Sequence, residues 1–356
     1  MATVFVGTYT ERLPHVNGRG AGIYVYSLNE GMLRPERAFR GLPNPSFLTI
    51  DPIRHRLYAV SESLEYGGLR QGAVQPWAWD SDSNTLEALH HLGTRGGAPC
   101  YISVTDHLLL IANYVGGSVT AIHLAEDGDI GQIASYMQHT GSGPNSVRQK
   151  SPHPHAIVPD PTGKYCLVPD LGTDEVYIYH LNRENRSLVL AGEAIKIHAG
   201  AGPRHLTFHP SGMGYYVLNE LDSSISFLSW ENGHSEVLRT TDALPEGYTG
   251  PRSGADIHAH PSGRFLYASL REISGIACFQ IAENSGELTD TAWFSTHGRT
   301  PRNFALDPRG EFLIAANQDS DTLVVFPINK KTGHLGDPTQ IINIPSPVCI
   351  QIVDLE

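Results

Sequence analysis

The sequence predicts an all-β protein, a seven-bladed β-propeller with four antiparallel strands per blade, in a single domain spanning residues 1–356. Three observations support this fold class. A sequence unit recurs at intervals of about 50 residues, each unit has room for four short strands, and the two ends of the chain complete one another. Helical periodicity is nearly absent.

Each unit begins with a small residue or Pro, continues through a short alternating run to Asp-Pro or His-Pro, and turns into a second apolar run. Third strands such as 175–179 follow, and turn clusters such as Asn284-Ser285-Gly286 then predict a hairpin into a fourth strand. Two weaker copies begin at Ala98 and Ser346. The five clear copies are Asn44-Pro45 to Asp51-Pro52, His153-Pro154 to Asp160-Pro161, Gly202-Pro203 to His209-Pro210, Gly254-Ala255 to His260-Pro261, and Thr300-Pro301 to Asp307-Pro308.

The ends of the chain complement each other. The last copy contains only one strand, residues 348–354, whereas the chain begins with three strands that belong to no complete unit, at 4–9, 23–28 and 33–39. Pairing these segments completes the last blade and closes the ring. Closure removes the exposed sheet edges that an open end would leave.

Composition restricts the function. With 25 Lys and Arg against 37 Asp and Glu, the formal charge is -12, so neither nucleic acid nor an anionic membrane is an expected partner. A small anion would need a local positive pocket. The four cysteines have no C-x-x-C spacing and are expected in the core. The first residues lack the pattern of a signal peptide, and no apolar run approaches the ~20 residues of a membrane span, so the expected compartment is the cytoplasm.

In a propeller the first strand of each unit lines the central channel, and its start lies beside the end of the second strand. The residue after the Pro and the residue closing the second apolar run should therefore meet at one rim. A solvated rim would also be charged, but the concentration of ionisable groups favours a site. The seven pairs are Ser46 with Glu62, Cys100 with Tyr114, His155 with Leu171, Arg204 with Glu220, Ala255 with Arg271, Arg302 with Gln318, and Val348 with Tyr9.

Two loops lead toward this rim. Residues 139–152 are rich in Gly, Ser and Pro and lead into His155, and residues 244–250 lead into Asp256. They are interpreted either as a lid over the site or as plain surface connections.

Several segments resemble the seven-bladed lactonase family, which includes the propeller-type 6-phosphogluconolactonases and the fungal carboxy-muconate cyclase. The resemblance covers essentially the whole chain. In the cyclase branch a His, an Arg, a Glu and a second Arg form the site, which implies His155, Arg204, Glu220 and Arg271 here. The segments are Thr8-Tyr9-Thr10, Asn44-Pro45-Ser46-Phe47, Pro152-His153-Pro154-His155, Gly202-Pro203-Arg204-His205 and Ala255-Asp256-Ile257-His258.

These residues suit lactone hydrolysis. Glu220 or His155 can serve as general base, and His155 can instead act as the acid for the ring oxygen. Arg204 and Arg271 suit the oxyanion and an anionic group. Arg302 is assigned to the far end of that anion, although a salt bridge to a rim acid is the stronger interpretation of this residue. Besides Arg302, the predicted substrate-binding residues are Glu62, Tyr9, Tyr114 and Asp256.

The predicted function is hydrolysis of a small anionic lactone, most simply a sugar lactone such as 6-phosphoglucono-lactone, without metal or other cofactor. Closure of a muconate diacid to a muconolactone and a non-catalytic binding platform remain alternatives. A divalent cation on oxygen ligands from Glu62, Asn113, Asn219 and Asp170 is a third, which the arginines at the same mouth disfavour. The sequence leaves the oligomeric state and the actual substrate open.

Overall fold

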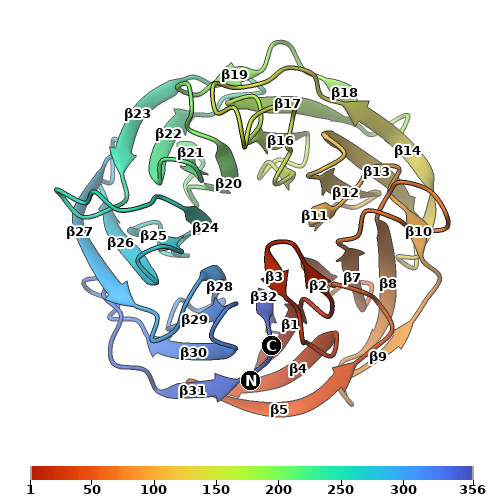
Figure 1. Cartoon of the computed structure of the whole chain (residues 1–356), viewed down its shortest axis with the longest axis horizontal. Coiled ribbons are helices and arrows are strands. Elements are labelled where there is room, and N and C mark those ends of the chain that lie inside the picture. Colours follow the sequence, from red (N-terminus) through yellow and green to blue (C-terminus); the bar gives the residue numbers. More distant parts are fainter. Residues whose placement is uncertain (1, 355–356) are drawn as a thin grey trace.

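The computed structural model describes residues 2–354 and contains strands, turns and loops throughout. Seven sheets stand in a ring around a central channel (Figure 1), so the predicted all-β, seven-bladed propeller is confirmed. No helix among the described residues is long and apolar enough to cross a lipid bilayer.

Each blade is an antiparallel sheet whose strands follow one another from the channel outward. The closing blade is made of β32 (Pro347–Val353), β1 (Ala2–Thr8), β4 (Ile23–Asn29) and β5 (Met32–Phe39). The next two are β6 (Leu48–Asp51), β7 (Arg56–Ser61), β8 (Ala73–Asp80), β9 (Thr85–Ala88) and β10 (Leu92–Gly93), then β11 (Pro99–Val104), β12 (Leu108–Asn113), β13 (Ser118–Leu124) and β14 (Ile130–Gln138).

The remaining four blades repeat this order around the ring. Two of them are β15 (Val158–Pro159), β16 (Tyr165–Asp170), β17 (Glu175–Asn182), β18 (Ser187–Leu190) and β19 (Ile195–Lys196), then β20 (Pro203–Phe208), β21 (Gly214–Asn219), β22 (Ser224–Ser229) and β23 (Val237–Asp242). The last two are β24 (Gly254–Ala259), β25 (Phe265–Leu270), β26 (Gly275–Ile281) and β27 (Leu288–Ser295), then β28 (Pro301–Leu306), β29 (Phe312–Asn317), β30 (Thr322–Pro327) and β31 (Gln340–Asn343).

Both chain ends lie in one sheet, as predicted. Strand β32 pairs with β1 from Thr3 opposite Val353 to Thr8 opposite Pro347, and β1 then pairs with β4. One element was not predicted. A small hairpin, β2 (Arg12–Leu13) and β3 (Val16–Asn17), is inserted between β1 and β4 and lies near the channel mouth (Figure 1).

The repeated Asp or His before each turn has a structural role. Asp160 accepts hydrogen bonds from the backbone N–H groups of Lys164 and Tyr165, which closes the turn into β16. His260 contacts Ser262 through Nδ1 and the Gly310 carbonyl of the next blade through Nε2. His260 therefore holds the turn of its unit, at the position that Asp160 occupies in another unit.

Neighbouring blades are joined through buried tyrosines. Tyr216 donates its hydroxyl to the carbonyl of Gly286 at 2.8 Å, and Tyr267 makes the same bond to Gly333 at 2.6 Å. Both glycines have positive φ, and a Cβ at Gly286 would overlap the Phe227 ring. The turn clusters recognised in the sequence thus need glycine both for their conformation and for contact between blades.

Closure of the ring gives a test of stability. Ile350 on β32 is 2% exposed and packs in the core formed with β1, whereas Ile341 on β31 is 52% exposed. We expect Ile350→Ala to lower the free energy of unfolding by about 2–5 kcal/mol. The matched change Ile341→Ala should stay within about 0.5 kcal/mol of wild type. Denaturant titration of both variants measures the difference, and equal losses would contradict the role of closure.

Candidate active site

The first strand of most blades carries an irregularity at the residue predicted to face the rim. Pro203 pairs with Asn219 and His205 with Leu218, so Arg204 stands outside the ladder. Arg302 is bypassed in the same way. A β-bulge re-aims a side chain without ending the pairing. The same shift in register occurs in the strands that contain Cys100, Asp256 and Val348.

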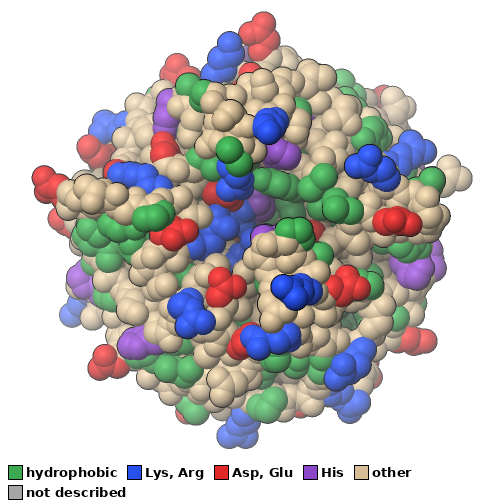
Figure 2. Space-filling model, in the orientation of Figure 1, with side chains coloured by type: hydrophobic (Ala, Val, Ile, Leu, Met, Phe, Trp, Pro, Cys, Tyr) green, Lys and Arg blue, Asp and Glu red, His purple; other side chains and the backbone are tan. Residues whose placement is uncertain are grey.

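The four predicted catalytic residues are brought together. Arg204 Nη1 lies 2.8 Å from Glu220 Oε2 and also contacts His155 Nε2, and Arg271 Nη2 lies 3.1 Å from the same carboxylate oxygen. Hydrogen bonds to backbone carbonyls hold two of these residues, because the Glu220 backbone N–H donates to the Gly202 carbonyl and the Arg204 Nε–H donates to the Ala255 carbonyl. Figure 2 shows the hollow at the channel mouth, with Lys and Arg side chains gathered in it.

The charges at this cluster determine its protonation. Burial by itself raises the pKa of Glu220, but Arg271, Arg204 and Arg148 outweigh burial and hold this pKa well below its usual range. Burial and then the neighbouring Arg204 guanidinium lower the pKa of His155, so the imidazole is neutral at pH 7. Burial also lowers the pKa of Arg204 to about 10, which leaves the guanidinium charged at neutral pH.

One residue of the cluster was missed by the sequence analysis. Arg148 Nη2 lies 2.6 Å from Glu220 Oε1 and 3.1 Å from the hydroxyl of Tyr114. Its side chain is 41% exposed, whereas that of Glu220 is 4% exposed. Arg148 belongs to the loop 139–152, which therefore covers part of the mouth. The sequence pointed to this loop but offered no periodicity that singles out one residue in it.

Tyr9, Glu62 and Arg302 form a second group. The Tyr9 hydroxyl donates to Glu62 Oε2 at 2.8 Å, and the Arg302 guanidinium lies 5.5 Å from the centre of the Tyr9 ring. The alternative salt bridge of Arg302 is not formed with any described carboxylate, since its contact is a cation–π interaction. Tyr9 is fully buried, so it supports Glu62 and Arg302 rather than contacting a ligand as predicted.

A small cavity connects the two groups. Glu62, His155, Arg204 and Arg302 all line it, together with His205 of β20. It has room for about one water molecule, so a substrate the size of a sugar must bind above it, at the mouth.

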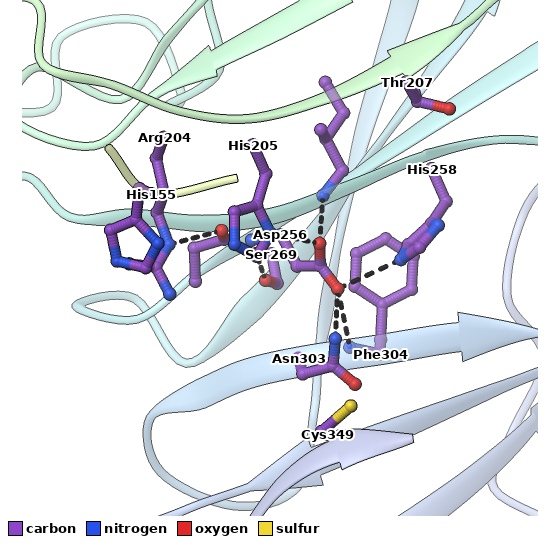
Figure 3. A network of polar contacts seen from close by, with 12 residues as sticks. His155, Arg204, His205, Thr207, Asp256, His258, Ser269, Asn303, Phe304 and Cys349 are labelled. Carbon is purple, nitrogen blue, oxygen red and sulfur yellow. Dashed lines mark hydrogen bonds and ion pairs between the residues drawn. The ribbon is translucent and has the colours of Figure 1, made fainter. Parts of the chain in front are cut away.

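Asp256 does not reach the mouth, contrary to its predicted role in substrate binding. It is 3% exposed, and its Oδ1 lies 2.7 Å from His205 Nδ1. Its Oδ2 lies 3.0 Å from His258 Nε2 and 2.5 Å from Asn303 Nδ2 (Figure 3). The regular alternation of an unbroken strand does not predict where the Asp256 side chain lies, because a bulge in β24 displaces this residue.

Of the residues considered for a metal, Asp170 has structural partners, whereas the side-chain oxygens of Asn113 and Asn219 are buried without a hydrogen-bond partner among the described residues. Asp170 accepts the His153 N–H and faces His139 Nδ1 at 2.7 Å. Asn113 and Asn219 donate to hydroxyl groups that follow in the next strand of their own blades. Within residues 2–354, no three His, Cys, Asp or Glu side chains are grouped as a metal site requires.

The second loop over the rim behaves differently from the first. In residues 244–250, Tyr248 bonds the carbonyl of Pro251 nearby. Among the described residues this loop makes no hydrogen bond or ion pair to a predicted site residue, so it is a surface connection. Of the two loops, the one that carries Arg148 is the candidate for a lid, because it contacts Glu220.

The fold and this cluster define a class of propeller enzymes with a charged channel mouth. The family model "Lactonase, 7-bladed beta-propeller" matches residues 3–352, and the chain belongs to this family. A 6-phosphogluconolactonase from Bacillus subtilis is 33% identical over 98% of this chain and 97% of its own length. One from Formosa agariphila is 34% identical over 93% and 94% respectively.

Solved structures agree with the sequence relatives. A putative 6-phosphogluconolactonase from Bacteroides fragilis superposes with a TM-score of 0.91 at 33% identity, covering 99% of this chain and 98% of its own. A periplasmic gluconolactonase from Pseudomonas aeruginosa gives 0.91 at 31% identity, covering 100% and 99%.

Arg148 is open to a direct test. We expect Arg148→Gln to lower kcat/KM for an anionic lactone by about tenfold, mainly through KM, because a charged hydrogen-bond donor is removed from the mouth. Lys150→Gln is the matched control, since Lys150 is exposed on the same loop. Steady-state kinetics of both variants decide the matter, and an unchanged KM for Arg148→Gln would refute the assignment.

Glu220 predicts a dependence of stability on pH. The pKa of Glu220 in the folded protein lies below the pKa of a Glu side chain in an unfolded chain, about 4.3. The contribution of the ionised Glu220 to the free energy of unfolding is therefore present above that pH and is lost as the pH falls further. We expect Glu220→Gln to lower the free energy of unfolding by about 3–5 kcal/mol at pH 7, because three arginines lose the carboxylate with which they are paired.

The cost of Glu220→Gln should shrink between about pH 4.3 and pH 3. Denaturant titrations at several pH values measure it, with Glu272→Gln at an exposed position as the control. A cost that does not change with pH would contradict the ionised, paired Glu220.

Proposed function

We propose that this protein hydrolyses a small anionic sugar lactone, 6-phosphoglucono-lactone, at the channel mouth by metal-independent acid–base chemistry. The observation that carries the proposal is the joined cluster of His155, Arg204, Glu220 and Arg271 in a member of the lactonase family. Relatives that match this chain over nearly its whole length are named 6-phosphogluconolactonase.

The charge balance of the mouth supports an anionic substrate. Arg148, Arg204, Arg271 and Arg302 stand against Glu62 and Glu220, which gives four positive and two negative groups, a local excess of two positive charges. The chain as a whole carries -12. A positive mouth on a negative protein attracts a small anion while the remaining surface repels larger polyanions.

Arg302 is the residue proposed to bind the phosphate. Burial lowers its pKa, but Tyr9, Glu62 and Glu220 outweigh burial and raise it, so the guanidinium stays charged. It has no carboxylate within salt-bridge distance among the described residues, and its planar fork of donors fits a phosphate.

Arg204 and Arg271 are proposed to stabilise the negative charge that develops on the lactone carbonyl oxygen. Both guanidinium groups reach the same oxygen of Glu220 and are therefore fixed before a substrate arrives. Donors held in position in a poorly solvated site stabilise a transition state without reorganising.

The cytoplasm is the proposed compartment. All four cysteines are buried and unpaired, which suits a reducing environment. The relative from Pseudomonas aeruginosa is described as periplasmic, so cell fractionation is the appropriate measurement.

The test is to assay the purified protein with 6-phosphoglucono-lactone, with unphosphorylated glucono-lactone and with a carboxy-cis,cis-muconate. Hydrolysis of the phosphorylated lactone supports the proposal. Turnover of the muconate alone would replace it with ring closure, and no turnover of any of the three would favour a binding platform.

Arg302→Gln sharpens this test. We expect KM for 6-phosphoglucono-lactone to rise by about 10–100-fold, the loss of a charged hydrogen bond, with a much smaller change for glucono-lactone. Arg299→Gln is the control, because Arg299 lies on the turn before β28 and bonds the carbonyl of Asp319. Equal effects of Arg302→Gln on both lactones would contradict phosphate binding.

A further inference from the structure

We propose that His205, oriented by Asp256, is the general base of lactone hydrolysis and acts on a water held in the cavity beneath the channel mouth. The inference rests on the proposed function and assigns its proton acceptor. It concerns residues that the sequence analysis gave either no catalytic role or a different one.

The two nitrogens of His205 have different surroundings. Nδ1 lies 2.7 Å from Asp256 Oδ1, which fixes the ring and places the proton on Nδ1. Nε2 is buried and has no hydrogen-bond partner among the described residues. The ring lines the same cavity as His155, Arg204 and Arg302. The lone pair on Nε2 is thus available to a molecule in the cavity.

A second buried pair in the chain shows what a purely structural arrangement looks like. His139 Nδ1 also lies 2.7 Å from an aspartate, Asp170, but its Nε2 is bonded to the Tyr179 hydroxyl at 2.9 Å. Every polar atom of that ring is satisfied within the fold. In the His205–Asp256 pair the imidazole Nδ1 is bonded to the aspartate in the same way, but Nε2 has no partner among the described residues.

Asp256 is held in the ionised state. Asn303 Nδ2 at 2.5 Å and His258 Nε2 at 3.0 Å share its Oδ2 (Figure 3). Burial alone raises the pKa of Asp256, but His258 and His205 outweigh burial and hold it well below its usual range. A fixed carboxylate of this kind orients an imidazole and stabilises the imidazolium that forms when the ring accepts a proton.

The groups that face His205 keep it neutral in the resting protein. Burial lowers its pKa to about 4, Asp256 opposes this, and Arg204 and His258 lower it further. The His155 and Tyr101 rings pack against it at 5.3 Å between centroids, and Phe47 at 6.0 Å. The ring therefore enters the reaction as a proton acceptor.

The cavity suits one water. Its walls include several polar side chains, and Ser46 Oγ is a second buried atom without a partner among the described residues. A buried water needs about two to four polar partners, and Ser46 and His205 supply two that the fold leaves open.

The two bases predicted from the sequence, Glu220 and His155, are occupied. Both oxygens of Glu220 are bonded to arginines, Oε1 to Arg148 and Oε2 to Arg204 and Arg271. His155 Nε2 accepts from Arg204 Nη1. Abstraction of a proton by either residue requires an ion pair or hydrogen bond to break first, whereas His205 Nε2 needs no such rearrangement.

The proposed step balances as follows. The water oxygen forms a bond to the lactone carbonyl carbon as one water proton passes to His205 Nε2, and the carbonyl π pair moves to its oxygen beside the arginines. Collapse of this intermediate re-forms the carbonyl and breaks the bond to the ring oxygen, which takes the proton from the imidazolium. The hydroxy acid that results then releases a proton to solvent.

His205→Asn tests the inference. An asparagine Nδ2–H can replace the Nδ1–H bond to Asp256, but it offers no base to the cavity. We expect kcat for 6-phosphoglucono-lactone to fall by about 100-fold or more while KM changes little, because general-base catalysis contributes about 10²–10⁴. His209→Asn is the matched control, since His209 is buried in the same blade with both nitrogens bonded, and its kcat should match wild type.

The pH profile separates a base from a structural residue. Only the neutral imidazole accepts a proton, so wild-type kcat/KM should decline as the pH is lowered toward about 4, and the residual activity of His205→Asn should not. Thermal unfolding of both variants checks that they are folded. A kcat for His205→Asn within about threefold of wild type would overturn the inference and leave the proposed lactonase standing. A wild-type protein inactive on every lactone would overturn both.

Discussion

The site depends on closure of the ring by β1 and β32. Tyr9 comes at the end of the first strand of the chain and Arg302 from its last complete blade, yet the two side chains are stacked. The antiparallel ladder between the chain ends holds them there, with Ile350 N–H donating at 2.7 Å to Asn303 Oδ1 on β28. The residues of the cavity and of the Glu220 cluster come from blades all around the ring, so any opening of the ring would separate groups that are now in contact.

A second constraint is electrostatic. A carboxylate as buried as Glu220 is costly unless its charge is compensated, and compensation by three guanidinium groups leaves the mouth with excess positive charge. The same arrangement that makes Glu220 tolerable in the fold prepares the arginines to receive an anion. It also makes Glu220 a weak proton acceptor, which is why the proposed mechanism assigns the activation of water to His205.

The sequence predicted the features that repeat and missed those that occur once. Recurrence of the unit determines the blades, the turn residues such as His260 and the rim positions of Arg204 and Glu220, because each copy supports the same interpretation. The β2–β3 hairpin has strands of two residues, too short for a periodic signal. Arg148 lies on a loop, where no periodic pattern in the sequence indicates in which direction a side chain points.

The bulges explain the misplacement of Asp256 and the omission of His205. A prediction based on strict alternation directs Arg204 and His205 to opposite faces, whereas the structure has both lining one cavity. The signal available in the sequence was the His that directly follows Arg204 and the Asp at the equivalent place in the next unit. Their pairing follows from the register shift, which a single sequence does not reveal.

The bulges also have a consequence for how such a site can diversify. A side chain outside the ladder has no cross-strand partner to match, so its size and charge are set by the channel rather than by the sheet. Equivalent positions here hold Cys100, Arg204, Arg302 and Val348 on closely similar backbones. Residues at these bulged positions can therefore be replaced one at a time without disturbing the pairing of the strands. A binding site for a new ligand could arise by such replacements on the same fold.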